Sequence, residues 1–152
     1  MDKNILGTGT VVQIAFVVHD IEKTSKDFAD FLGMDETPGW IWTGTREQAQ
    51  TEYRGNPSDA RSKLAFFSIG EGIQLELIEP DMTPSTWRDD LDKNGEGFHH
   101  IAFFVKGMKE KITLLGKNGM ELIQKGEYAG GRYAYIDARD SLKTVLELLE
   151  ND

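Results

Sequence analysis

The chain contains no cysteine among its 152 residues. This absence excludes disulfide bonds, thiolate metal ligands and cysteine nucleophiles together. The sequence also has no apolar run near the roughly 20 residues that a membrane-spanning helix needs. Its first ten residues, MDKNILGTGT, lack the basic and apolar segments of a secretory signal. From the sequence we therefore expect a cytoplasmic protein with no membrane partner.

Positive charge is scarce, with 17 Lys and Arg residues against 26 Asp and Glu and a net charge of −9. Because nucleic-acid binding needs clustered Lys and Arg, we expect no nucleic-acid partner. Hydrophobic residues make up 39% of the chain, which is typical of globular proteins. A chain of this length can form one domain or two small fused halves, and we expect a single domain over residues 1–152.

Two pairs of matching segments indicate an internal repeat. Residues 13–18 read QIAFVV and residues 100–105 read HIAFFV, whereas residues 75–79 read LELIE and 146–150 read LELLE. The matches occur in the same order, and a segment with helical spacing follows each I-A-F strand. Each half therefore predicts a strand, a helix and then two or three antiparallel strands.

The first predicted helix begins after Asp20, a suitable N-cap, and ends at Gly33. Its expected buried face consists of Ile21, Thr24, Phe28, Phe31 and Leu32. We place the first module at about residues 10–80 and the second at about 98–150, joined by a linker helix at about 84–94. Residues 36–60 are rich in turn-forming and polar residues and are expected to form a variable flap of the first module.

Alternation along the strands predicts that four polar side chains share one face. Gln13 lies opposite the larger apolar residues of its strand, and His100 does so in the matching strand, together with Phe98. In the two L-E-L strands, Glu76 and Glu147 point away from the flanking leucines. A carboxylate in a half-buried sheet is costly unless another charge compensates it, and a cation does so. We therefore predict that all four residues bind one divalent metal ion.

The oxygen and nitrogen donors of this set suit Zn, Co, Mn, Ni, Fe or Mg. Four protein ligands leave one or two positions of an octahedral ion for water or substrate, as in catalytic sites. Taken singly, each residue also has a structural explanation, because a strand glutamate can face solvent and a histidine or glutamine can be satisfied in the core. The repeat-equivalent positions favour the metal. His99 alternates to the helix-covered face and is expected to pack there or to support a ligand.

These residues and motifs resemble the vicinal oxygen chelate superfamily, which includes glyoxalase I, methylmalonyl-CoA epimerase, bleomycin-resistance proteins and extradiol dioxygenases. The likeness covers nearly the whole chain and is strongest to the epimerases, in IQLELIEP at 73–80 and GEGFHHIAF at 95–103. It implies an α+β fold in which paired βαβββ modules form a curled mixed sheet around a metal site. One ligand would come from the first and last strand of each module, and the protein would be a homodimer.

Two departures from the epimerase pattern keep other activities open. The epimerases usually carry His where this chain has Gln13, and the set of Gln, Glu, His and Glu instead resembles zinc-type glyoxalase I. The epimerases also carry a further glutamate in the loop before the third strand. Here that loop reads GNPSDARS, and only Asp59 or the more distant Glu52 could serve as a second base.

The resemblance implies proton transfer α to a carbonyl, with Glu147 as the ligand that also acts as the base and Glu76 as its partner. Gln74, Tyr133 and Tyr135 are expected to line the concave face and contact a small-molecule substrate. The first hypothesis is an isomerase or epimerase acting on an acyl thioester or 2-oxo compound. The second is a lactoylglutathione lyase, and the third is a non-catalytic small-molecule binding or resistance protein.

Overall fold

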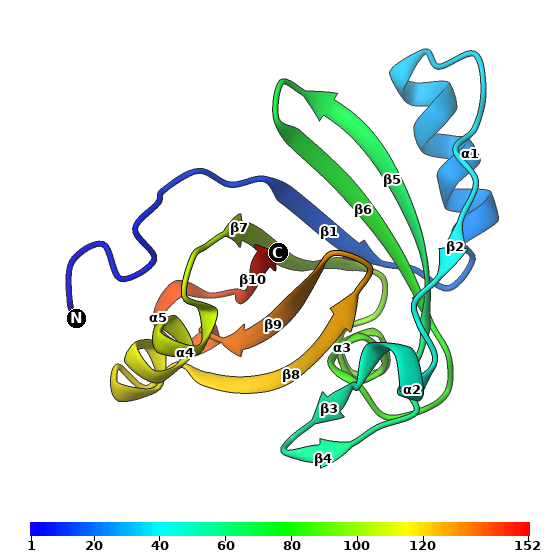
Figure 1. Ribbon diagram of the computed structural model, residues 1–152. Helices are drawn as coiled ribbons and strands as arrows, with labels where there is room; N and C mark the ends of the chain where they lie inside the picture. The colour runs from blue at the N-terminus through cyan, green and yellow to red at the C-terminus, as the bar shows by residue number, and fades with distance from the viewer.

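Ten strands form one curled mixed sheet in the order β2-β5-β6-β1-β7-β10-β9-β8-β3-β4 in the computed structural model, which describes residues 1–152 (Figure 1). The first half supplies β1 (Gln13–Val17), α1 (Ile21–Leu32), β2 (Ile41–Trp42), β5 (Ser62–Gly70) and β6 (Ile73–Pro80). The second half supplies β7 (Gly97–Phe104), α4 (Met108–Lys117), β8 (Glu121–Tyr128), β9 (Gly131–Asp137) and β10 (Val145–Asn151). The matching orders β1-β6-β5-β2 and β7-β10-β9-β8 confirm the predicted fold class of paired βαβββ modules in a curled sheet.

The two halves join through their first strands. β1 pairs with β7 in antiparallel fashion, while β6 runs parallel to β1 and β10 runs parallel to β7. The strands that carry the four predicted ligands are therefore four consecutive strands, β6-β1-β7-β10, at the centre of the sheet.

Two helices cover the outer face of the sheet, one for each half. Leu75 and Leu77 of β6 share a buried cluster with Ile21 and Ala29 of α1. Leu146 and Leu148 of β10 share another with Met108 and Leu115 of α4. The leucines on either side of each glutamate thus face a helix, so that Glu76 and Glu147 point to the concave face, as alternation predicts.

The ends of α1 follow the sequence, but two residues of its expected face do not. The Asp20 carboxylate accepts a hydrogen bond from the Lys23 backbone N–H, and Gly33 adopts φ 70° to end the helix. Ile21 and Ala29 are buried, whereas Phe31 is 83% exposed and Leu32 is 39% exposed. At 100° per residue Phe31 lies on the flank of the stripe that contacts the sheet, and Leu32 is the last residue of the helix, so including these two in the buried face was wrong.

The segment predicted to be a flap links the two halves. It forms β2, α2 (Arg46–Ala49), β3 (Glu52–Tyr53) and β4 (Asn56–Pro57). β2 pairs with β5 of the first half, but β3 pairs with β8, the outermost long strand of the second half. The segment therefore crosses the concave side from one edge of the sheet to the other (Figure 1).

Two further helices lie between strands. α3 (Thr86–Asn94) begins at Ser85, whose hydroxyl accepts a hydrogen bond from the Arg88 backbone N–H. α5 (Arg139–Leu142) is a single helical turn between β9 and β10. Trp87 and Leu91 of α3 pack in a third buried cluster with Ala15 of β1, on the side of the sheet away from α1. None of the five helices has the length and apolarity needed to span a bilayer.

Candidate metal and catalytic site

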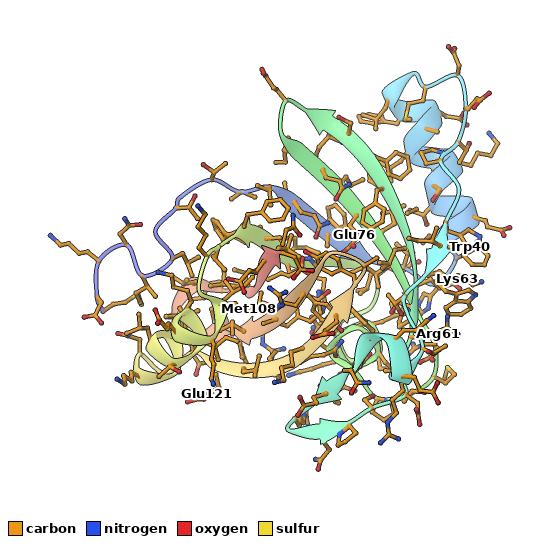
Figure 2. The ribbon with its side chains drawn as sticks, in the orientation of Figure 1. Trp40, Arg61, Lys63, Glu76, Met108 and Glu121 are labelled. Carbon is orange, nitrogen blue, oxygen red and sulfur yellow. The ribbon has the colours of Figure 1, made fainter.

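The side chains of the four predicted ligands meet at the middle of the sheet. His100 Nε2 lies 3.0 Å from Gln13 Oε1 and 3.0 Å from Glu147 Oε2, and it lies 3.7 Å from Glu76 Oε1. All four side chains are buried. Figure 2 labels Glu76 near the middle of the molecule, where strands of both halves come together.

The two I-A-F repeats create room for this cluster. Ala15 pairs with Glu76 on one side and with His100 on the other, so the three residues share a face. Ala102 likewise pairs with Gln13 and Glu147. Both alanines are completely buried, and their small side chains leave space that the four longer polar side chains fill.

Burial controls the charge of the cluster. It raises the pKa of the Glu147 carboxyl to about 8. Burial and the charge of Glu147 raise the pKa of Glu76 well above its usual value. Burial also lowers the pKa of the His100 imidazole to about 3, so this ring is neutral at physiological pH and its Nε2 can act as a ligand. Two buried carboxyl groups thus face a neutral imidazole without a compensating charge.

Two oxygens of the cluster have no hydrogen-bond partner. They are Glu76 Oε1 and Glu147 Oε2. The latter lies close to His100 Nε2, but this nitrogen is directed at Gln13 Oε1, so Glu147 gains no hydrogen bond from it. Buried carboxylate oxygens are rarely left unsatisfied, and a divalent cation would satisfy both.

The side-chain amide of Gln13 is held so that its oxygen faces the cluster. Its Nε2 donates to Gln74 Oε1 at 2.9 Å, which leaves Oε1 directed at the centre of the cluster. No three His, Asp or Glu side chains stand at metal-ligand spacing as they are placed. The donor types suit a divalent cation, but binding one here would require the Glu76 and Glu147 side chains to move toward it.

A β-bulge changes the expected orientation of the residues before His100. The register of β1 and β7 shifts so that Ala15 pairs with His100 but Phe16 pairs with Phe98. Phe98 consequently packs against Phe16, with ring centroids 6.3 Å apart, and not on the face of His100. The prediction that strict alternation holds through this strand was wrong, because the bulge adds one residue to β7.

The same bulge brings His99 to the cluster. His99 is buried, and its Nδ1 lies 2.7 Å from His100 Nδ1, so one ring nitrogen donates to the other. When His100 carries its proton on Nδ1, His99 accepts it and His100 Nε2 is free to bind a cation. The expected placement of His99 on the face opposite His100 was therefore wrong.

A cavity of about 1210 Å³ opens above the cluster. Gln13, Glu76 and Glu147 line it, whereas His100 is completely buried behind them. The three side chains expected to contact substrate, Gln74, Tyr133 and Tyr135, also line it. The structure thus brings all seven predicted site residues to one place.

Hydrogen bonds from α3 and β8 hold the two tyrosines. Trp87 Nε1 donates to the Tyr135 hydroxyl at 3.0 Å, and Gln124 Nε2 donates to the Tyr133 hydroxyl at 3.1 Å. Gln124 is itself held by the Thr86 backbone N–H, which donates to its Oε1 at 3.0 Å. Sequence reasoning missed Gln124, although a glutamine inside the strand pattern of β8 was an available signal.

Neither alternative second base reaches the cavity. Asp59 is exposed and lies 3.9 Å from Arg46, and Glu52 pairs with Lys125 at 3.2 Å. Glu76 and Glu147 are the two carboxylates at the floor of the cavity.

Comparison with known proteins places these observations in a family. The model of the Glyoxalase/Bleomycin resistance protein/Dioxygenase superfamily matches residues 12–135. An uncharacterized protein of Bacillus subtilis (strain 168), YqjC, is 33% identical over 95 residues, which are 60% of this chain and 67% of that protein.

Solved structures show the same fold. A hypothetical protein from Bacillus halodurans C-125 superposes with a TM-score of 0.66 at 25% identity over 94% of each chain. Methylmalonyl-CoA epimerase from Mycobacterium tuberculosis gives 0.63 at 19% identity over 100% of this chain and 93% of that chain. A variant of the Streptomyces coelicolor epimerase, in complex with 2-nitronate-propionyl-CoA, gives 0.60 at 20% identity over 93% and 96%.

Proposed function

The chain belongs to the glyoxalase/bleomycin resistance protein/dioxygenase superfamily, and from this premise we propose that it is a metal-dependent isomerase or epimerase. Its reaction would move a proton at the carbon next to a carbonyl group of a small substrate. The observation that carries this proposal is the pair of buried, unpartnered carboxylate oxygens of Glu76 and Glu147 beside neutral His100.

The proposed metal ligands are Gln13, Glu76, His100 and Glu147. A divalent cation held there would supply positive charge that stabilises the negative oxygen of an enolate. His99 keeps the His100 ring oriented through the contact between their Nδ1 atoms. Gln74 keeps the amide oxygen of Gln13 directed at the same point.

Glu147 is the proposed base. Its carboxylate would take the α proton of the substrate, leaving the electron pair on the enolate, and would return the proton to the same or the neighbouring carbon. In the metal-free protein burial raises the pKa of Glu147 to about 8, and a bound cation would oppose this shift and favour the carboxylate form that a base requires. Glu76, from the matching strand of the other half, could return the proton from a second position.

Exchange of the substrate's α hydrogen for solvent deuterium tests the proposal. We expect the protein loaded with Zn, Co, Mn, Ni, Fe or Mg to catalyse exchange on racemisable thioesters or 2-oxo compounds. Glu147→Gln should lower the exchange rate by at least about 100-fold, the usual contribution of a general base. Glu121→Gln, an exposed substitution outside the cavity, serves as the matched control. Failure of every metal-loaded form to exchange any of these substrates would reject the function.

Gln13 favours a second candidate, a lactoylglutathione lyase. Its side-chain oxygen, 3.0 Å from His100 Nε2, stands where a first-strand amide ligand is expected. Turnover of the methylglyoxal–glutathione hemithioacetal, followed by absorbance, distinguishes this reaction from epimerisation.

A further inference from the structure

The charged side chains that line the cavity are all carboxylates. Glu76 and Glu147 lie at its floor, and Glu127 of β8 adds a third. No Lys or Arg is among the 23 residues that line it. A divalent cation held at the floor would offset the charges of Glu76 and Glu147, so Glu127 is the carboxylate of the lining that stays uncompensated. An anionic group of the substrate that lies away from the floor would therefore lose water without gaining a counter-charge from the protein.

β5 forms one wall of the cavity, and Lys63 of this strand points away from the cavity. Leu64 and Phe66 of β5 line the cavity, so Lys63, the residue before Leu64, points to the opposite face of the sheet. Its Nζ lies 3.0 Å from Glu79 Oε2 and 4.5 Å from the centre of the Trp40 ring. Figure 2 shows Lys63 and Trp40 together at the outer edge of the sheet, away from Glu76.

The guanidinium groups of Arg61 and Arg132 also bind protein groups outside the cavity. The Arg61 guanidinium donates two hydrogen bonds to the Thr43 carbonyl oxygen, at 3.0 and 2.9 Å. Arg132, on the face of β9 opposite Tyr133, pairs with Glu150 at 2.9 Å and with Asp152. A phosphate or carboxylate at the mouth of the cavity would have to break one of these contacts to gain a cation.

The walls of the cavity expose apolar side chains. Ile41 of β2 pairs with Leu64 and is 59% exposed, and Phe104 of β7 is 47% exposed beside its partner Leu149. Large apolar side chains exposed in a concave surface mark a site that an apolar ligand covers. The two walls come from different halves of the chain and face the same polar floor.

We propose that the substrate is an uncharged carbonyl compound with an apolar body. Its carbonyl group would lie at the floor beside Glu76 and Glu147, and its apolar body would lie against Leu64, Phe66 and Phe104. This assignment rests on the proposed function and narrows it, because it disfavours substrates carried on coenzyme A or glutathione, whose phosphates or carboxylates are anionic.

Two thioesters of the same acid test the charge dependence. The 2-phenylpropionyl ester of N-acetylcysteamine is uncharged, whereas the 2-phenylpropionyl ester of coenzyme A carries several negative charges and has the same reacting carbon. We expect the uncharged ester to bind the metal-loaded protein at least tenfold more tightly by calorimetry. Its kcat/KM for deuterium exchange should exceed that of the coenzyme A ester by a similar factor.

The two measurements separate the possible failures. A binding preference below tenfold, including no binding of either ester, overturns the substrate class, and exchange of the coenzyme A ester would then leave the proposed function intact. A tenfold preference in binding without any exchange rejects proton transfer on these substrates and supports the ligand class alone.

A pair of charge-reversal variants tests whether the cavity itself sets the preference. Glu127→Lys places a cation in the lining of the cavity, and we expect it to reduce the preference for the uncharged ester at least threefold. Glu121→Lys makes the same change of charge in the same strand but outside the cavity, and it should leave the preference unchanged. Equal shifts in both variants would mean that net charge controls binding and would overturn the assignment.

Discussion

At the scale of single residues, the raised pKa of Glu147 couples the stability of the metal-free protein to pH. The folded-state value of about 8 lies above the usual 4.5, so the folded state binds the proton more tightly than the unfolded state. The resulting stabilisation is complete below the unfolded-state pKa and is lost as pH rises through the folded-state value. Between pH 6 and pH 8 we expect the free energy of unfolding to fall by about 2 kcal/mol.

Urea denaturation of chelator-treated protein at the two pH values measures this effect. Glu147→Gln has no ionisable group at this position, so its stability should change less over the same range, and what remains reflects the raised pKa of Glu76. A metal-free wild-type protein that is equally stable or more stable at pH 8 would contradict the pKa assignment.

At the scale of elements, the central strands depend on their alanines. Ala15 lies in β1 between Glu76 and His100, is completely buried, and leaves the space that the polar cluster fills. Ala15→Leu should lower the free energy of unfolding by about 1–3 kcal/mol, because overpacking forces neighbouring side chains from their positions. It should also lower the affinity for the metal more than tenfold, measured by calorimetry.

Ala29→Ser, a smaller change in the interface between α1 and the sheet, is the control for a general loss of stability. It should reduce stability without changing the affinity for the metal. Unchanged metal binding in Ala15→Leu would show that the cluster does not depend on the spacing of β6, β1 and β7.

At the scale of the whole molecule, the proposed metal joins strands of both halves. A cation bound by β1 and β6 of one half and by β7 and β10 of the other would stabilise only the folded arrangement. At a concentration 100 times its dissociation constant, it should add about 2.7 kcal/mol to the free energy of unfolding. For a chain of this size this raises Tm by roughly 5–10 °C. A Tm that is the same with each divalent metal and with chelator would reject the site.

The sequence by itself determined the duplicated sheet and the composition of its polar cluster. The I-A-F and L-E-L repeats fixed four strands, and alternation fixed which side of each strand Gln13, Glu76 and Glu147 occupy, because the period of two is a local property of any extended chain. The caps of α1 at Asp20 and Gly33 could also be predicted from the sequence, because capping involves only neighbouring residues.

Only the tertiary structure decided features that depend on partners distant in the chain. The bulge that turns His99 toward His100 arises from the pairing of β7 with β1, and a single strand carries no sign of its partner's register. The crossing of residues 36–60 from β5 to β8 likewise depends on where the second half lies. The charge of the cavity lining is a sum over both halves, so the selection of an uncharged substrate could be inferred only after the sheet had brought Leu64, Phe104 and Glu127 around one space.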